Sequence, residues 1–576
     1  MSTPKEIFLE LIKPDGQPER QLCQYEALHM CLTDPINTYL RGNRKRGSVS
    51  KDRWGTTISF PEDAPGPIPV HTPELSVCTD VTRWKETVHV PDLSVCSEGW
   101  EECRTRSRAA ADAEGKLLAG FMGTGIFEQC HFLMGFEDTL TALYEHPDEM
   151  HELIETITQY RLDYVRRLID GLQPDVIFSH DDWGTKNALF MKPDMWREFF
   201  KEPYRRFYGY IRSRGVITIH HADSYLVPIV DDMAEIGIQV WQGTLPENDI
   251  PALQRHLSGK LTLMGGFGAA IDRADAQPDE ILAYARDALA RYCPGGHFIP
   301  SITYGLAGTV FPHVDQYLDQ AVNEYNAGLH IPVTPLPAVP KRKISEAKAE
   351  TVQAVTSAQE SADVFENIAR ALERGQQKKL LTLCQQALDE GHEPGDILSK
   401  GMIVGMNRLG EAFSANRAFV PEMLMAARCM SAATELLKPL MVGEGTEPVG
   451  RVCLGTVKGD MHDIGKNLVK IMMEGSGIEV FDLGVDTSAE QFVSTAVENH
   501  CGVIACSSLL TTTMEEMREV VKLVHERGLQ DQIKVMVGGA PISQSFCDEI
   551  GADYYAEDAG AAAREAVAIL KAQKAS

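Results

Sequence analysis

Four prolines lie within nine residues of this chain, in the segment 332–340 (PVTPLPAVP). Proline fixes one backbone angle and donates no backbone hydrogen bond, so such a segment is unsuited to the interior of a helix or sheet. A stretch rich in Ala, Glu, Ser and Gln follows to about Asp363, and we predict an interdomain linker over 332–362. The chain of 576 residues is also too long for one hydrophobic core. We therefore expect separate domains on either side of the linker.

Short apolar runs alternate with helical patterns in the part before the linker, residues 1–331. Nearly continuous apolar runs of this length predict strands that are buried on both faces, as in a parallel sheet. Repeated strand–helix units predict an α/β domain, either a barrel or an open parallel sheet. The predicted strands cover 175–180, 216–222, 238–243, 261–266 and 297–302.

Polar residues follow these predicted strands directly. In a β/α barrel the carboxyl ends of the strands form the rim that holds the active site. Polar side chains after several successive strands are hard to explain by solubility alone. The candidate catalytic residues are Asp181, Asp182, His221, Asp223 and Tyr304.

The part after the linker divides into two patterns. Residues 363–447 carry apolar residues at helical spacing and predict a helical domain. Strand and helix patterns alternate again over 448–576, with strands predicted at 451–457, 478–483, 502–507 and 533–537. Four or five such units predict a small, doubly wound Rossmann-like domain.

The strongest motif is 459–465 (GDMHDIG), which lies between the first of these strands and a helix. In doubly wound folds, the loop at the carboxyl end of a strand is where ligands bind. His462 is displayed there to offer an imidazole nitrogen to a metal. Asp460 can accept the proton on the other ring nitrogen, which fixes the tautomer and makes the ring more basic.

Two more loops, 507–513 (SSLLTTT) and 537–541 (VGGAP), follow the third and fourth strands. The three motifs together resemble the cobalamin-binding domain of methionine synthase and the small corrinoid proteins, which share D-x-H-x-x-G, S-x-L and G-G. The resemblance implies cobalamin as the cofactor and His462 as the lower ligand of its cobalt. It implies a hydrogen-bonded relay of Asp460 and Ser507 behind that histidine. The residues implied to line the channel for the cofactor tail are Gly465, Leu509, Gly538 and Gly539.

The helical segment also fits this resemblance. Residues 409–413 (LGEAF) and 419–424 (FVPEML) are similar to the four-helix cap that covers the methyl face in methyl-carrying corrinoid proteins. Adenosylcobalamin mutases generally lack such a cap. The resemblance therefore implies methyl transfer and disfavours radical isomerisation.

Residues 110–330 resemble the uroporphyrinogen decarboxylase superfamily, through 216–223, the pattern P-x-x-x-D-M-x-x-x-G at 228–237, 264–266 (MGG) and Gly295-Gly296. The resemblance implies a (β/α)8 barrel, and the attached corrinoid domain implies the methyltransferase branch of that superfamily.

Some members of that branch bind zinc through His-x-Cys and a distant Cys. This chain has His221-Ala222-Asp223 at the first of these places, so the thiolates are missing, and residues 301–304 stand where the later Cys would fall. His221 and Asp223 remain possible zinc ligands. The alternative is that they orient a substrate by hydrogen bonds. The departure also argues against a thiol as the methyl acceptor.

The order of barrel, cap and corrinoid domain in one chain resembles chloromethane:corrinoid methyltransferases. That resemblance implies transfer of a methyl group from chloromethane or another halomethane to a Co(I) corrinoid, forming methyl-Co(III). The implied partners are a second methyltransferase that uses tetrahydrofolate and a reductive activator of the corrinoid. The alternatives are an O-demethylase of methoxylated aromatic compounds, a decarboxylase with a corrinoid-sensing domain and a corrinoid-based regulator.

The composition excludes several other classes. A formal net charge of −27 disfavours binding to nucleic acids and anionic membranes. Thirteen cysteines, an odd number without a C-x-x-C pair, argue against a disulfide framework. No apolar run reaches the length of a membrane span, and the first residues lack the pattern of a signal peptide. We expect a cytoplasmic enzyme.

Overall fold

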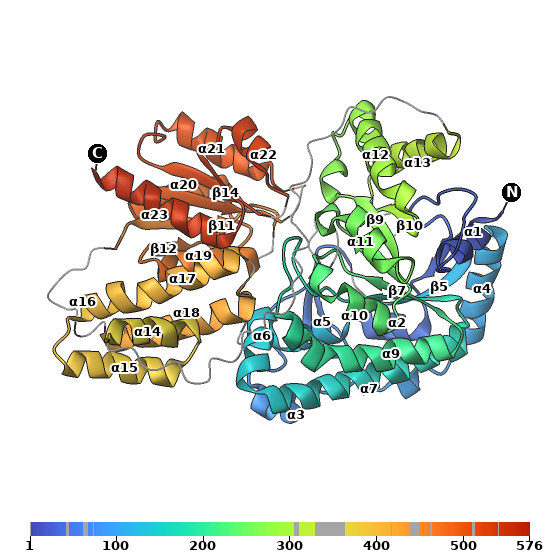
Figure 1. Ribbon diagram of the computed structural model, residues 1–576, viewed down its shortest axis with the longest axis horizontal. Coiled ribbons are helices and arrows are strands. Elements are labelled where there is room, and N and C mark those ends of the chain that lie inside the picture. Colours follow the sequence, from blue (N-terminus) through green and yellow to red (C-terminus); the bar gives the residue numbers. More distant parts are fainter. Residues whose placement is uncertain are drawn as a thin grey trace. The chain divides into compact units, whose positions relative to one another are not determined.

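The computed structural model describes residues 2–41, 45–60, 67–72, 74–304, 310–328, 363–415, 417–437, 440, 448–460, 464–509, 513–539 and 541–575. The chain forms two compact units, Met1–Ala347 and Lys348–Ser576 (Figure 1). The predicted linker 332–362 and the motif residue His462 lie outside the described residues. The predicted domain boundaries remain predictions.

A sheet of parallel strands forms the centre of the first unit. Its strands are β1 (Leu28–Cys31), β5 (Leu117–Met122), β6 (Val176–His180), β7 (Ile217–His221), β8 (Val240–Thr244), β9 (Thr262–Phe267) and β10 (Phe298–Ile302). They are hydrogen-bonded in the order β1-β5-β6-β7-β8-β9-β10. Residues from every strand, such as Leu28, Phe178, Ile219, Met264 and Ile299, meet in one core cluster. The sheet is therefore curled around a common interior (Figure 1), which confirms the barrel-type prediction.

Seven parallel strands are present among the described residues, one fewer than the (β/α)8 pattern has. The seam between β10 and β1 is bridged by the segment that precedes β1, because the backbone N–H of Gln24 donates to the carbonyl of Pro300 at 2.8 Å. Leu22 and Tyr25 of this segment are part of the barrel core. Pro300 has no backbone N–H to give to a further strand, as is typical of edge positions.

Helices connect the strands and lie on the outside of the barrel (Figure 1). They are α1 (Pro4–Leu11), α2 (Pro35–Arg41), α3 (Trp84–Thr87), α4 (Trp100–Ala113), α5 (Ile126–Met134), α6 (Phe136–Glu145), α7 (Pro147–Leu172), α8 (Pro193–Trp196), α9 (Glu202–Ser213), α10 (Val230–Glu235), α11 (Ile250–Leu257), α12 (Pro278–Tyr292) and α13 (Pro312–Asn326). A small antiparallel sheet, which the sequence patterns did not predict, consists of β2 (Ser48–Lys51), β3 (Thr57–Phe60) and β4 (Ile68–Pro69).

The second unit begins with the predicted helical cap. Its helices are α14 (Val364–Glu373), α15 (Gln377–Asp389), α16 (Pro394–Asp396), α17 (Ile403–Ser414), which follows a π-helical turn at Ile397–Met402, and α18 (Val420–Leu437). Residues one helical turn apart, such as Ile368 and Leu372 of α14, are buried in the core that these helices share.

A five-stranded parallel sheet completes this unit. The elements are β11 (Arg451–Thr456), α19 (Ile464–Gly475), β12 (Glu479–Asp482), α20 (Ala489–Glu498), β13 (Val503–Ser507), α21 (Glu516–Glu526), β14 (Lys534–Gly538), α22 (Gln544–Ile550), β15 (Tyr554–Ala556) and α23 (Ala559–Ala575). The strand order β12-β11-β13-β14-β15 is a doubly wound order, which confirms the Rossmann-like prediction.

The residues of β11 explain why both faces of this sheet are covered. Val452 and Leu454 point into the core formed with α19, α23 and the cap, whereas Cys453 between them packs in the core formed with α20 and α21. This alternation is the two-residue period of a strand. No helix in the described part of the chain is long and apolar enough to cross a membrane.

Candidate functional site

A buried carboxylate anchors the rim of the barrel. Asp181, directly after β6, is fully buried and accepts hydrogen bonds from the backbone N–H groups of Phe127 and Glu128, both at 2.9 Å. It also accepts from the indole of Trp183 at 3.1 Å and from the hydroxyl of Tyr204. Asp181 thus satisfies free N–H groups in the first turn of α5. Both of its oxygens are engaged, so the structure places this predicted catalytic residue in a structural role.

Gly125 permits this close approach. A Cβ atom added at Gly125 would lie 2.0 Å from Cγ of Asp181, which no side chain could accommodate without a shift. The helix that follows then places Glu128 over the end of β6, where its carboxylate accepts from the N–H of Gly125 at 3.1 Å. Glu128 was not among the residues predicted from the sequence.

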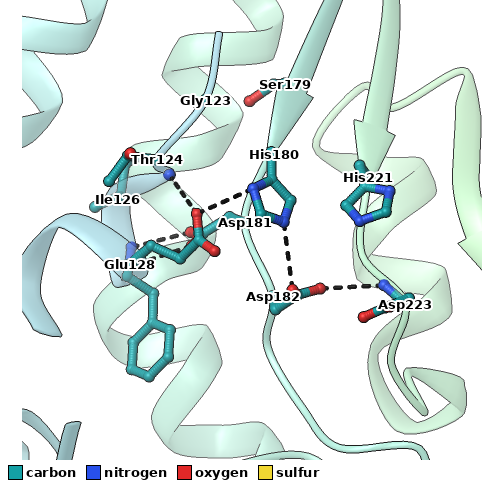
Figure 2. Close-up of polar contacts among 12 residues, drawn as sticks. Gly123, Thr124, Ile126, Glu128, Ser179, His180, Asp181, Asp182, His221 and Asp223 are labelled. Carbon is teal, nitrogen blue, oxygen red and sulfur yellow. Dashed lines mark hydrogen bonds and ion pairs between the residues drawn. The ribbon is translucent and has the colours of Figure 1, made fainter. Parts of the chain in front are cut away.

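Four side chains at the ends of β6 and β7, with Glu128, form a polar cluster (Figure 2). Nδ1 of His180 lies 3.4 Å from Oε2 of Glu128, and Nε2 lies 3.3 Å from Oδ2 of Asp182. The other oxygen of Asp182 accepts from the backbone N–H of Asp223 at 3.1 Å. The ring of His221 lies beside that of His180, with 4.7 Å between their centroids. We call these five residues, Glu128, His180, Asp182, His221 and Asp223, the rim cluster.

A second hydrogen bond fixes the orientation of His221. Nδ1 of His221 contacts Oε1 of Gln242 on β8. The amide nitrogen of Gln242 donates to the carbonyl of Ile302 on β10 at 3.2 Å, which determines which end of the amide faces the ring. Because the amide oxygen can only accept, Nδ1 of His221 carries the proton and Nε2 keeps its lone pair. Figure 2 shows one ring nitrogen of His221 directed toward His180 and Asp182.

The charges in the rim cluster are strongly coupled. Burial raises the pKa of Glu128, and burial with the nearby charge of Asp182 raises the pKa of Asp223. Although burial opposes it, the negative charges of Glu128 and Asp182 raise the pKa of His180. Burial, reinforced by the positive charge of His180, lowers the pKa of His221 to about 4. The neutral imidazole of His221 is the form that binds metals.

Tyr304 and His220 form hydrogen bonds with residues outside the rim cluster. Tyr304, predicted as catalytic, donates its hydroxyl hydrogen bond to Asp272, a buried residue whose other oxygen accepts from the N–H of Phe311 at 2.9 Å. His220 on β7 is buried, with Nδ1 at 2.6 Å from the hydroxyl of Tyr208 and its ring stacked on Trp183. The rim cluster therefore contains His221 but neither His220 nor Tyr304.

The second unit has a buried carboxylate at the end of β11. Asp460 is fully buried, and its Oδ2 accepts from the hydroxyl of Ser508 at 3.1 Å, the N–H of Leu509 at 2.7 Å and the hydroxyl of Thr513 at 3.0 Å. The Ser508 and Thr513 hydroxyls lie 2.9 Å apart. β11 and β13 are adjacent strands whose connections leave on opposite sides of the sheet, and ligands of doubly wound folds bind at such a point.

The partners of Asp460 differ from the expected relay. The sequence predicted a hydrogen bond between Ser507 and Asp460. In the structure the hydroxyl groups of Ser508 and Thr513 donate to Asp460 instead. Ser507 is the last residue of β13 and its carbonyl accepts from the N–H of Val457. Ser508 follows the strand, and it is its hydroxyl that reaches Asp460.

The residues around Asp460 fit a large, flat cofactor. A Cβ added at Gly465, at the start of α19, would meet none of the described residues within 4 Å. The side chain of Leu509 is 45% exposed, an unusual position for leucine, and offers an apolar surface. Gly539, with φ of +134°, packs so closely on Ser508 that a Cβ would lie 1.8 Å from its carbonyl oxygen. Gly539 thus allows the end of β14 to pack directly against the residue that hydrogen-bonds to Asp460.

Comparisons with protein families agree with this division of the chain. Residues 49–325 match the uroporphyrinogen decarboxylase (URO-D) family, and residues 364–438 and 450–568 each match a B12 binding domain family. The first match covers the barrel strands β5 to β10 but not β1, the second covers the helical cap and the third covers the five strands of the doubly wound domain.

Known proteins are similar to parts of this chain. Dimethylamine corrinoid protein 2 of Methanosarcina acetivorans is 38% identical over 209 residues, which are 36% of this chain and 96% of that protein. The methanol:cobalamin methyltransferase complex of Methanosarcina barkeri is 24% identical, covering 42% of this chain and 98% of that one, with a TM-score of 0.34. A methyltransferase from Methanosarcina mazei is 17% identical, covering 56% of this chain and 99% of that one, with a TM-score of 0.43. The chain therefore belongs to the corrinoid protein family, as a fusion of two B12-binding domains with a domain that matches the uroporphyrinogen decarboxylase family.

Proposed function

We propose that the rim cluster holds a small methyl donor and that the methyl group passes to a corrinoid in the second unit of the same chain. The rim cluster is the observation that supports this proposal. The same chain also contains Asp460 and its hydrogen-bond partners, in the domain that matches the B12 binding family. When bound, the corrinoid supplies a nucleophilic cobalt that takes the methyl group from the donor. Among the chain's own residues, we assign support of the His462 imidazole to Asp460, two residues before it in the motif, and Asp460 is itself held by Ser508 and Thr513.

The chemistry of the rim cluster favours a donor whose methyl group is bonded to oxygen. An alkoxide or phenoxide leaves only with help from a proton or a metal ion, whereas chloride leaves without either. The cluster concentrates three carboxyl groups and two imidazoles at one place on the rim. We therefore propose a methoxylated compound as the donor. A halomethane, which the likeness to chloromethane:corrinoid methyltransferases suggests, is the second candidate.

Within this proposal, the residues of the rim cluster have separate tasks. Gln242 fixes the orientation of His221, and the backbone N–H of Asp223 fixes that of Asp182. Nε2 of His221 and Oδ2 of Asp182 therefore lie in defined positions. Groups held in this way need little rearrangement to orient a donor. A second methyltransferase that serves tetrahydrofolate and a reductive activator of the corrinoid are the partners that we propose.

The identity of the donor can be tested with the full-length protein loaded with cobalamin and reduced to Co(I). We expect methoxyarenes to change the visible spectrum from that of the reduced corrinoid and to release one phenol per methyl group transferred. Chloromethane, methanol and methylamines are the comparison donors. A spectrum that responds to chloromethane alone would contradict the oxygen-bonded donor, and no response to any donor would contradict methyl transfer itself.

His462→Ala tests the proposed lower ligand. We expect the variant to lose the spectroscopic signature of a nitrogen ligand on cobalt, most clearly in the electron paramagnetic resonance spectrum of its Co(II) form. Asn499→Ala, which lies away from the motif loops, is the control. An unchanged cobalt spectrum in His462→Ala would reject this ligand assignment.

A further inference from the structure

Three residues of the rim cluster are arranged as metal ligands. His180, Asp182 and His221 each offer one ligand atom, and these atoms all lie within 4.8 Å of one another. Among the described residues, this is the one group of three or more His, Cys, Asp or Glu side chains that meets this condition. We propose that these three residues bind a divalent transition-metal ion, zinc for instance, through two imidazole nitrogens and one carboxylate oxygen.

The distance between the first two ligands fits such an ion. Nε2 of His180 and Oδ2 of Asp182 lie 3.3 Å apart. In a tetrahedral zinc site with bonds of about 2.0–2.1 Å, neighbouring ligand atoms are separated by about 3.3–3.4 Å. The two atoms therefore stand at the separation that a shared ion requires.

Each of the three ligands is also held from behind. Nδ1 of His221 donates to the Gln242 amide, whose own orientation is set by the carbonyl of Ile302. Nδ1 of His180 faces the Glu128 carboxylate at 3.4 Å, which leaves Nε2 for the ion. Oδ1 of Asp182 accepts from the N–H of Asp223 and from the hydroxyl of Ser224 at 3.4 Å, which leaves Oδ2.

Support of this kind points to a ligand site. Histidines that bind metals almost always donate their second N–H to a carboxylate or carbonyl group. Here the carboxylate of Glu128 on α5 and the amide carbonyl of Gln242 on β8 supply that support. An ion-paired histidine between two acids would account for His180 and Asp182, but it would not account for the fixed, inward-facing lone pair of His221.

The ligand set differs from that of the zinc-binding relatives and from the pair expected from the sequence. None of the three ligands is a thiolate, and all thirteen cysteines are buried elsewhere in the two units as free thiols. The sequence predicted Asp223 as the carboxylate ligand. In the structure the carboxylate of Asp182 stands in this place, and Asp223 contacts it through its backbone N–H. A site made of nitrogen and oxygen atoms suits a donor that binds through oxygen.

The role of the ion rests on the proposed function, but its binding does not. An ion held by three protein ligands keeps at least one position open, where an ether or alcohol oxygen can coordinate and leave more easily. Binding is measured without any donor, so a failure of methyl transfer and a failure of metal binding are distinguishable.

The experiment measures zinc in the full-length protein after equilibration with zinc alone and removal of the excess. We expect about one bound zinc per chain. His180→Ala, Asp182→Asn and His221→Ala should each weaken zinc binding by more than 100-fold, and Gln242→Leu by about 10- to 100-fold. Asp223→Asn is the matched control and should keep its zinc, because its backbone N–H is unchanged.

X-ray absorption at the zinc edge gives a second measurement. We expect nitrogen and oxygen neighbours at about 2.0–2.1 Å and no sulfur at about 2.3 Å. Tryptophan fluorescence shows whether each variant is folded, since all six tryptophans lie in the first unit. The proposal is overturned by a sulfur shell, by the absence of stoichiometric zinc in the wild-type protein, or by loss of zinc from Asp223→Asn with retention in Asp182→Asn.

Discussion

The double variant His221→Ala/Asp223→Ala should transfer methyl groups from the donor about 10²- to 10⁴-fold more slowly while it retains its corrinoid. His221 is the last residue of β7, and its ring lies beside that of His180, whereas Asp223 follows the strand and donates its backbone N–H to Asp182. Their removal takes away the imidazole that Gln242 orients and the carboxyl group of Asp223, and a single catalytic acid or base contributes about 10²- to 10⁴-fold. The measurement is single-turnover methyl transfer to the reduced holoprotein.

Two observations make this experiment specific. The two segments that match B12 binding domains belong to the second unit, so the corrinoid content and the spectrum of the unreacted protein should equal those of the wild type. The matched control is His256→Ala/Asp231→Ala, because this pair is also a histidine and an aspartate in contact, at 2.9 Å, on the same barrel. Those side chains are 49% and 71% exposed. Full activity in the His221/Asp223 variant would place the donor away from this rim.

Most strands of the fold could be predicted because their apolar runs are nearly continuous. The runs at β6, β7, β9 and β13 contain Val, Ile, Leu or Phe and are flanked by polar residues. β1 has four residues and includes a histidine, and β5 (LLAGFM) contains Ala, Gly and Met, which favour strands weakly. Hydrogen bonding to neighbouring strands of the barrel stabilises β1 and β5 in spite of this weak preference. Such pairing involves distant residues, so a local sequence pattern does not predict it.

The candidate site could be predicted only where its residues directly follow a strand. Asp182, His221 and Asp223 are of this kind. Glu128 reaches the cluster from the first turn of α5, and it was missed because β5, the strand before that helix, was not recognised. Ser507 was chosen over Ser508 because a sequence motif does not show which of two adjacent serines points to Asp460.

The role of Asp181 could not be predicted either, since four donors from three separate segments meet on it. Its sequence neighbour Asp182 has the same chemistry and an equally good position after β6. The difference between them is burial, because Asp181 is fully buried and the side chain of Asp182 is 28% exposed. Because of this difference, Asp181 stabilises the barrel, whereas Asp182 remains accessible as a member of the rim cluster.

Asp181→Ala should therefore destabilise the barrel by roughly 3–5 kcal/mol, the largest loss of stability that we expect from a single substitution on the rim. It leaves two backbone N–H groups of α5, the Trp183 indole and the Tyr204 hydroxyl without their acceptor. Each buried donor that loses its partner costs about 1–3 kcal/mol, and part is recovered because a buried charge is removed.

The measurement is guanidinium unfolding of the full-length protein followed by tryptophan fluorescence, which reports on the barrel because all six tryptophans lie in the first unit. Gly125→Ala should lower the midpoint as well, because the new methyl group would collide with Asp181. Asp231→Ala, with a side chain that is 71% exposed, should leave the midpoint within experimental error. Tyr204→Phe removes a single donor and should have an intermediate effect of about 1–2 kcal/mol. If Asp181→Ala unfolded at the wild-type midpoint, the helix would not depend on this carboxylate, and Asp181 would again be a candidate acid for the donor.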